Sequence, residues 1–389
     1  MQTTVVLAMT SLLAVSAMAA WNALEQASLA ACPCAEASLC LPVVSDRRFE
    51  VFAFSPSGGD NWRYYDYSVL TTIAWNLDKG LLCHAHAHGV KIVALHNFEH
   101  VDQLCNASAR QAWVHATYIA IVTNYADGVN VDTEAEITRH DHAACLTLLL
   151  QELRVELQAH AFTRHAQITF DVAWSPSGVD QRYYDYAGLA AAADYVFVMA
   201  YDMRSQLYDH CLAGANSPIA QVQRGLDDYI NGAEVPKAKL LLGLPWYAYQ
   251  YPCRHYDPIS DLCSLSAVPF RGAPCSDAAG VQLDYHDVLT QLDAPPTTRR
   301  WDNVTATPYF VHRNATGGIF QTWYDDPESL RAKFALAADL GGLGMWHVDA
   351  LDYSGKHAPT ASTLAMWQVL HDAVPKTTIA IVSDPVALA

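Results

Sequence analysis

Short apolar runs rich in β-branched residues recur along the chain, separated by longer segments of helical composition. This alternation indicates parallel strands joined by helical crossovers. We predict eight strands, at Phe49–Phe54, Val69–Trp75, Lys91–His96, Asp127–Glu134, Gln167–Trp174, Asp194–Tyr201, Lys239–Trp246 and Gly342–Asp349. Eight such units favour an α/β fold of the (β/α)8 TIM barrel type, whose active sites lie at the carboxyl ends of the strands.

A doubly wound open sheet is the alternative fold. It would place a glycine-rich phosphate turn after an early strand, but the Gly58-Gly59 pair after Phe54 lacks the G-x-G-x-x-G spacing. The barrel is therefore the better prediction.

The chain is predicted to hold one catalytic domain with additions. An insertion of about residues 247–322, rich in Cys, Pro and aromatic residues, separates the last two predicted strands. No Ser/Gly-rich or charged linker divides the chain, so we assign residues 49–375 to the barrel. Residues 21–48 form a cysteine-rich N-terminal segment, and the tail 376–389 suggests no role.

The N-terminus predicts entry into the secretory route. Residues 1–20 are apolar or small and end in Ala17-Met18-Ala19, which is typical of a signal-peptide core and cleavage site, although no Lys or Arg lies near Met1. A short buried helix is the alternative. Asn-x-Ser/Thr triplets at Asn106, Asn303 and Asn314 are candidate glycosylation sites and support the same route.

The cysteine pattern suits an oxidising compartment. The chain has 10 cysteines, which cluster near the N-terminus at Cys32, Cys34 and Cys40 and in the insertion at Cys253, Cys263 and Cys275. We expect local disulfides within these clusters. Zinc is the alternative, but no His pair stands beside them at finger-like spacing.

Composition narrows the class of ligand. Hydrophobic residues make up 52% of the chain, which excludes a disordered protein because such a chain can bury a large core. Lys and Arg number 23 against 40 Asp and Glu, so the net charge is −17. This charge argues against nucleic acid and anionic membranes as partners and favours a neutral or cationic ligand and an acidic compartment.

The segment Asp127–Glu134 carries the clearest chemical signal. Side chains alternate along a strand, so Asn130, Asp132 and Glu134 share one face. Carboxylates on the inner face of a buried strand are costly unless they are paired or protonated. Partial burial beside a like charge favours the protonated form of Glu134, which suits a proton donor. An interior polar network or a cation site is the alternative.

This segment resembles the D-x-x-D-x-D-x-E signature of glycoside hydrolase family 18. The resemblance extends in order to Met199–Asp202 (M-x-Y-D), Gly243–Tyr247 (G-x-P-x-Y), Trp323–Asp326 and Gly344–Trp346. Members of the family usually have a strand at the segment that corresponds to Trp323. The resemblance implies a retaining glycosidase in which the substrate's own 2-acetamido group replaces an enzyme nucleophile.

The resemblance also implies residue roles. Glu134 would protonate the glycosidic oxygen, Asp132 would accept the acetamido N–H, and the Tyr201 hydroxyl would hydrogen-bond the acetamido carbonyl. Substrate binding is expected from Trp346, Asp202, Asn130 and Met199. The partner is an oligosaccharide that contains N-acetylglucosamine (GlcNAc). We expect no cofactor, no metal and a monomer.

Segments outside the general signature, at Cys32–Cys40, Phe170–Pro176 and Val268–Gly280, resemble one lysosomal branch of the family. That branch implies cleavage of the GlcNAc-β1,4-GlcNAc linkage of free N-glycan oligosaccharides, with release of GlcNAc from the reducing end. A secreted chitinase or an endo-β-N-acetylglucosaminidase is the alternative, followed by a non-catalytic chitin-binding lectin.

Asn130 departs from the general signature, since many members carry an Asp there that can share a proton with the middle Asp. An Asn cannot take a charge, so we expect Asp132 to be tuned by hydrogen bonding rather than by a second carboxylate. Asp127 is expected to anchor the turn into its strand. His84, His86 and His88 are expected at a helix end, where cationic side chains favour the dipole; a metal site is the alternative.

Overall fold

The computed structural model describes residues 22–44, 49–206, 210–354 and 360–375. The predicted signal segment and the C-terminal tail lie outside these residues.

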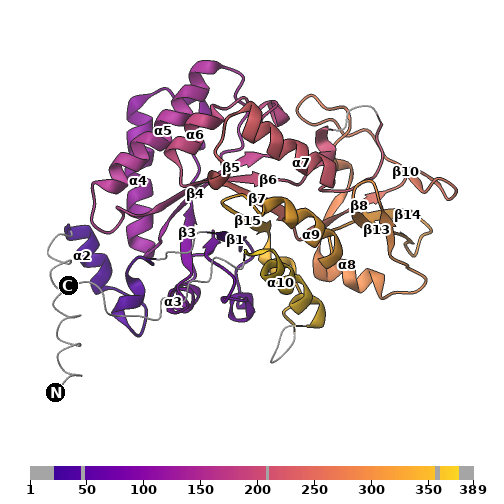
Figure 1. The fold of residues 1–389 in the computed structure, drawn as a ribbon, viewed down its shortest axis with the longest axis horizontal. Helices are drawn as coiled ribbons and strands as arrows, with labels where there is room; N and C mark the ends of the chain where they lie inside the picture. Colours follow the sequence, from indigo (N-terminus) through magenta and orange to yellow (C-terminus); the bar gives the residue numbers. More distant parts are fainter. Residues whose placement is uncertain (1–21, 45–48, 207–209, 355–359, 376–389) are drawn as a thin grey trace.

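Eight parallel strands close into a barrel in the order β1-β15-β7-β6-β5-β4-β3-β2 (Figure 1). They are β1 (Glu50–Phe54), β2 (Thr72–Ala74), β3 (Lys91–Leu95), β4 (Gly128–Val131), β5 (Gln167–Ala173), β6 (Tyr195–Met199), β7 (Leu240–Pro245) and β15 (Gly342–Trp346). Each coincides with one of the eight predicted runs, so the (β/α)8 barrel prediction is confirmed.

Both faces of the strands are covered, so most strand residues are apolar, and the polar ones on the inward face, such as Asn130 and Asp171, are hydrogen-bonded. Every residue of β1, β4, β5 and β7 is buried. Phe52, Phe197 and Leu241 belong to an inner cluster, whereas Val51 and Val129 belong to the larger layer between strands and helices. The interior is therefore packed and leaves chemistry to the strand ends.

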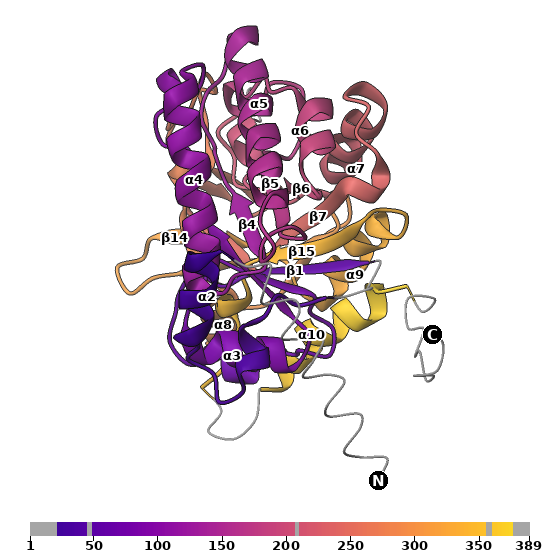
Figure 2. The same cartoon turned by 90° about the vertical axis from the view of Figure 1, so that its left-hand side faces the viewer.

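Helices cover the outside of the barrel (Figure 2). They are α3 (Lys79–Ala87), α4 (Ala107–Asn124), α5 (His140–Gln158), α6 (Tyr186–Ala192), α7 (Ile219–Asp227), α9 (Pro327–Phe334) and α10 (Ala361–Ala373). An additional helix, α2 (Ala23–Ala30), contacts α4. None of the helices within the described ranges is long and apolar enough to cross a membrane.

The predicted insertion is present between β7 and β15. Its core is an antiparallel sheet in the order β11-β8-β14-β13-β12, beside a β9-β10 hairpin and helix α8 (Tyr285–Leu292). The strands are β8 (Tyr247–Pro252), β9 (His255–Asp257), β10 (Leu262–Ser264), β11 (Val281–Asp284), β12 (Arg300–Asp302), β13 (Thr307–Arg313) and β14 (Ile319–Trp323). The Trp323 segment is thus a strand, as the family resemblance indicates, and it belongs to the sheet of the insertion rather than to the barrel.

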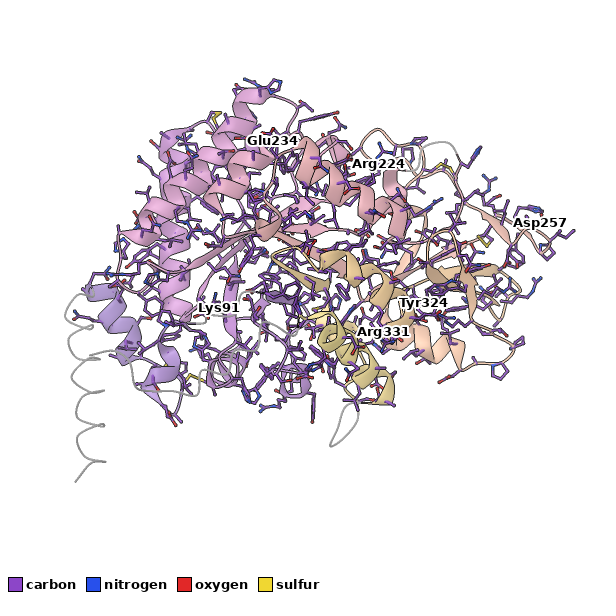
Figure 3. All side chains as sticks on the ribbon, viewed as in Figure 1. Lys91, Arg224, Glu234, Asp257, Tyr324 and Arg331 are labelled. Carbon is purple, nitrogen blue, oxygen red and sulfur yellow. A yellow bond between two sulfur atoms is a disulfide. The ribbon has the colours of Figure 1, made fainter. Side chains whose placement is uncertain are left out.

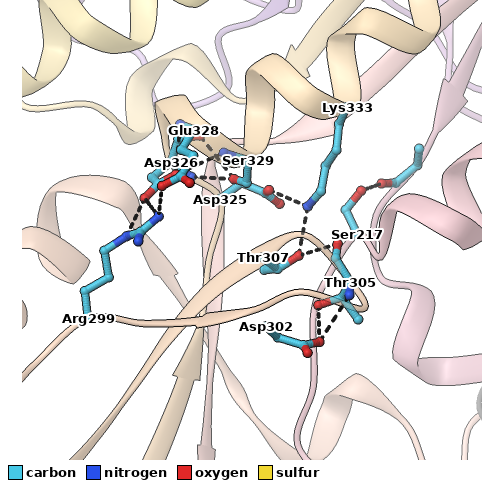
Figure 4. Close-up of polar contacts among 11 residues, drawn as sticks. Ser217, Arg299, Asp302, Thr305, Thr307, Asp325, Asp326, Glu328, Ser329 and Lys333 are labelled. Atoms are coloured by element: carbon cyan, nitrogen blue, oxygen red, sulfur yellow. Dashed lines mark hydrogen bonds and ion pairs between the residues drawn. The ribbon is translucent and has the colours of Figure 1, made fainter.

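Buried contacts fasten the insertion to the barrel. Tyr324, labelled in Figure 3, directly follows β14, and its ring centroid lies 6.0 Å from that of Phe310 in β13. The Lys333 ammonium on α9 pairs with Asp325, and both side chains are 0% exposed (Figure 4). Lys333 also donates to Thr307 Oγ1 at 3.1 Å. A buried charge is tolerated when it is paired and hydrogen-bonded in this way.

All 10 cysteines are paired. The five disulfides are Cys32–Cys40, Cys34–Cys83, Cys105–Cys145, Cys211–Cys275 and Cys253–Cys263. The expectation of local pairing within each cluster is confirmed for the first and last pairs. It is wrong for Cys34 and Cys275, because the fold brings helix α3 and the segment after β6 closer to them than their sequence neighbours.

The three predicted glycosylation acceptors are exposed. Asn303 and Asn314 lie in turns of the insertion. Asn106 begins α4, and its Oδ1 accepts from the backbone N–H groups of Ser108 and Ala109 at 3.0 and 3.4 Å. Their modification stays a prediction.

Asp127 anchors the entry into β4, as expected. It accepts hydrogen bonds from the backbone N–H groups of Ile92 and Val43 at 2.7 and 2.6 Å. It also pairs with His86 Nε2 at 2.9 Å, and both side chains are 2% exposed. His84 lies instead against the Tyr67 ring, at 4.6 Å between centroids. The histidines of α3 therefore face different partners.

Candidate active site

A cavity of about 190 Å³ opens at the carboxyl ends of the barrel strands. Six of the predicted site residues line it: Asp132, Glu134, Met199, Tyr201, Asp202 and Trp346. The seventh, Asn130, is 0% exposed and meets the cavity through hydrogen bonds to Trp75 and Asp171. The structure thus brings together residues that are up to 216 positions apart in the chain, because every strand ends at this face.

Asp132 lies one residue beyond β4 and points inward. Its backbone N–H donates to Asn97 Oδ1 at 2.8 Å. No described residue donates a hydrogen bond to its buried Oδ1. Burial and the charge of Glu134 raise the pKa of Asp132 to about 7, against the opposing charge of Arg182.

Glu134 is held by a cation that sequence reasoning missed. Arg182, in the loop between β5 and α6, donates from Nη2 to Glu134 Oε2 and lies 3.3 Å from Asp180. The Arg182 side chain is 5% exposed and that of Glu134 is 45% exposed. Glu134 therefore has a cation beside it in addition to the like charge of Asp132 that the sequence indicates.

A second missed residue, Asp171 of β5, also lines the cavity. Its Oδ1 accepts from Asn130 Nδ2 at 2.7 Å. Burial, together with the charge of Asp132, raises the pKa of Asp171 well above its ordinary range. A second carboxyl therefore lies beside Asp132 although position 130 carries none, and it comes from the neighbouring strand.

Tyr201 and Asp202 follow β6. Burial and the nearby charges of Asp171 and Asp132 hold the pKa of Tyr201 well above its usual value, so its hydroxyl remains a donor. The Asp202 carboxylate accepts from the Tyr247 hydroxyl and, at 3.0 Å, from the Tyr249 hydroxyl. Burial raises the pKa of Asp202 to about 6 although these tyrosines oppose the shift.

Aromatic rings form one wall of the cavity. Trp346 ends β15, with its ring centroid 4.8 Å from Trp75 and 5.3 Å from Phe54. Pyranose faces stack on such rings, so this wall can hold a sugar against the carboxylates. The arrangement offers an acid–base pair, a hydroxyl donor and an apolar platform in one cavity.

Comparison with known proteins agrees with this geometry. The family described as "Glycosyl hydrolases family 18" matches residues 95–350. The chain is 38% identical to the di-N-acetylchitobiase of Rattus norvegicus, over 94% of this chain and 99% of that protein. It is 39% identical to the di-N-acetylchitobiase of Homo sapiens, over 87% and 88% respectively.

Among solved structures, a group IV chitinase of Ostrinia furnacalis in complex with allosamidin is similar, with a TM-score of 0.65 and 18% identity. The similarity covers 84% of this chain and 100% of that one. This likeness supports the fold.

Proposed function

The chain belongs to glycosyl hydrolase family 18 and is a glycoside hydrolase, and from that premise we propose that it hydrolyses the GlcNAc-β1,4-GlcNAc linkage of chitobiose-containing oligosaccharides. The proposal rests chiefly on one observation. Asp132 and Glu134 share a cavity with Tyr201 and Trp346. A neutral, amide-bearing sugar needs no basic patch, which agrees with the net charge of −17.

The proposed mechanism is retaining and substrate-assisted. Glu134 donates its proton to the glycosidic oxygen as the bond from C1 breaks, and the 2-acetamido carbonyl oxygen bonds to C1 from the opposite face. Asp132 accepts the acetamido N–H and offsets the positive charge of the oxazolinium ion, while the Tyr201 hydroxyl donates to the acetamido oxygen. Glu134 then takes a proton from the water that attacks C1. The bond between C1 and the acetamido oxygen breaks, which opens the oxazolinium ring, and the β-anomer is released.

The relatives named di-N-acetylchitobiase support a finer proposal. The enzyme releases a single GlcNAc from the reducing end of free N-glycan oligosaccharides, and it reaches the lysosome through the secretory pathway. The buried ion pair between His86 and Asp127 supports an acidic setting, because protonation of the histidine strengthens it.

Digestion of chitooligosaccharides and free N-glycans labelled at the reducing end tests this function. We expect one labelled GlcNAc as the product and, by proton NMR, the β-anomer of the newly formed reducing end. Labelled products of two or more sugars would favour endo action. An initial α-anomer would contradict the substrate-assisted mechanism. Binding without turnover would favour a lectin.

A further inference from the structure

Asp171 lines the cavity, yet the mechanism above gives it no role. The barrel register explains its position. Val131 of β4 pairs with Phe170 of β5, so the next residues, Asp132 and Asp171, lie side by side at the ends of adjacent strands. Both side chains point inward, because residues in register on neighbouring strands share a face.

A chain of hydrogen bonds orients Asp171. Trp75 Nε1 donates to Asn130 Oδ1 at 2.7 Å, which identifies the oxygen of that amide. The Asn130 Nδ2 therefore faces Asp171 and donates to its Oδ1 at 2.7 Å. The Oδ2 of Asp171 is left as the atom that can carry a proton.

Asp132, in turn, has a carboxylate oxygen that lacks a hydrogen-bond donor. Its Oδ1 is buried, and no residue in the described ranges donates to it. A buried, ionised oxygen without a donor is costly, whereas a neighbouring carboxylic acid has one O–H to give. Burial and the charge of Asp132 raise the pKa of Asp171 well above its ordinary range, so Asp132 is the first of the two to ionise.

We propose that Asp171 is a positioning residue that works as a neutral carboxylic acid, donating its Oδ2–H to Oδ1 of Asp132. This hydrogen bond stabilises the ionised form of Asp132, which is the form that accepts the acetamido N–H. Asn130 serves Asp171 as its fixed amide donor. A carboxyl pair thus spans β4 and β5, although position 130 within the β4 signature carries no charge.

Kinetics provide the first test, which rests on the proposed function. Asp171→Asn keeps a neutral donor toward Asp132, so we expect the acid limb of kcat/KM to remain within about 0.5 pH unit of the wild type. Asp171→Leu removes the donor, and the limb should move up by about one unit, which is a tenfold loss of kcat/KM on the acid side. Thr169→Val, one step deeper on the same inward face of β5, is the matched control and should change neither kcat nor KM.

If Asp171 were ionised instead, the acid limb of kcat/KM would shift in the opposite direction. Removing its negative charge would lower the pKa of Asp132, so the acid limb would move to lower pH in both Asp171 variants. That result, or identical limbs in Asp171→Leu and wild type, would overturn the proposal.

The second test follows protonation directly and needs no substrate, so its result remains valid even if the proposed substrate is wrong. The side-chain carboxyl carbon of Asp171 is followed by ¹³C NMR across pH in the wild type and in Asp132→Asn. We expect Asp171 to stay protonated through neutral pH in the wild type. It should ionise at lower pH in Asp132→Asn, because the charge of Asp132 is gone. A wild-type Asp171 that is already ionised at pH 5 would refute the proposal even if the Asp171 variants fail to fold.

Discussion

Arg182 donates from Nη2 to Oε2 of Glu134, so the carboxyl that we propose as proton donor is one half of an ion pair. The cation belongs to the loop that follows the next barrel strand. In this loop, Asp180 and Gln181 directly precede Arg182, and their φ angles are +55° and +60°. The orientation of Glu134 therefore depends on the conformation of a neighbouring loop as well as on its own strand.

Glu134→Gln should lower kcat about 10³-fold or more, because an amide cannot supply the proton to the leaving oxygen. Substrate binding should persist, since the shape of the side chain is unchanged. Glu136→Gln is the matched control. It lies two residues further along, is half-exposed and pairs with Arg271 at 3.3 Å, so its kcat should stay near that of the wild type. Full turnover by Glu134→Gln on chitobiose would remove Glu134 from the acid role.

The pH dependence of the wild type should report Asp132. This group works ionised, and burial and Glu134 raise its pKa to about 7, so it becomes protonated as the pH falls below that value. We expect kcat/KM to fall about tenfold per pH unit below about pH 7. The acid limb of kcat should lie lower, because in the enzyme–substrate complex the acetamido N–H donates to ionised Asp132 and lowers its pKa, so the saturated enzyme still turns over in an acidic compartment. A kcat/KM limb near pH 4, the ordinary range of Asp, would contradict this assignment.

Arg182→Gln should move the acid limb of kcat/KM to higher pH. The guanidinium charge lowers the pKa of Asp132, so its removal raises that pKa further and reduces kcat/KM on the acid side. Arg182→Lys keeps the charge and should show a smaller shift. Profiles of kcat/KM against pH for the three proteins decide the matter, and coincident limbs would show that Arg182 does not act on Asp132.

The barrel could be predicted because its signal is local. Each of the eight strands is a short, apolar, β-branched run, and strand alternation alone places Asp132 and Glu134 on one face. Asp171 carried a similar signal, as an acidic residue within the buried run Gln167–Trp174. Its partnership with Asp132 depends on the register between β4 and β5, which sequence periodicity does not contain.

Other features depend on tertiary placement. Arg182 is the only Lys or Arg between Trp174 and Asp185, yet nothing local says that it turns toward Glu134. The disulfide from Cys34 to Cys83 likewise forms because the N-terminal segment lies against α3. Contacts between distant segments follow from the packed fold and are not encoded in the spacing of the residues.

The His86–Asp127 pair should make the fold more stable in acid than in base. Burial opposes the charge on His86, but the hydrogen bond and the charge of Asp127 raise its pKa overall. A histidine whose pKa is raised by folding contributes stability that is fully present below about pH 6.5, its unfolded value, and is lost as the pH rises through the folded pKa.

His86→Gln should therefore lower the free energy of unfolding by roughly 3 kcal/mol at pH 5, as expected for breaking a buried ion pair, and by less at pH 8. Urea unfolding at both pH values measures the difference. His84→Gln, on the same helix, is the control with the opposite sign. Burial and the charge of His88 lower the pKa of His84, so its removal should not destabilise the fold preferentially in acid. An equal loss at both pH values in His86→Gln would show that the histidine acts only through packing.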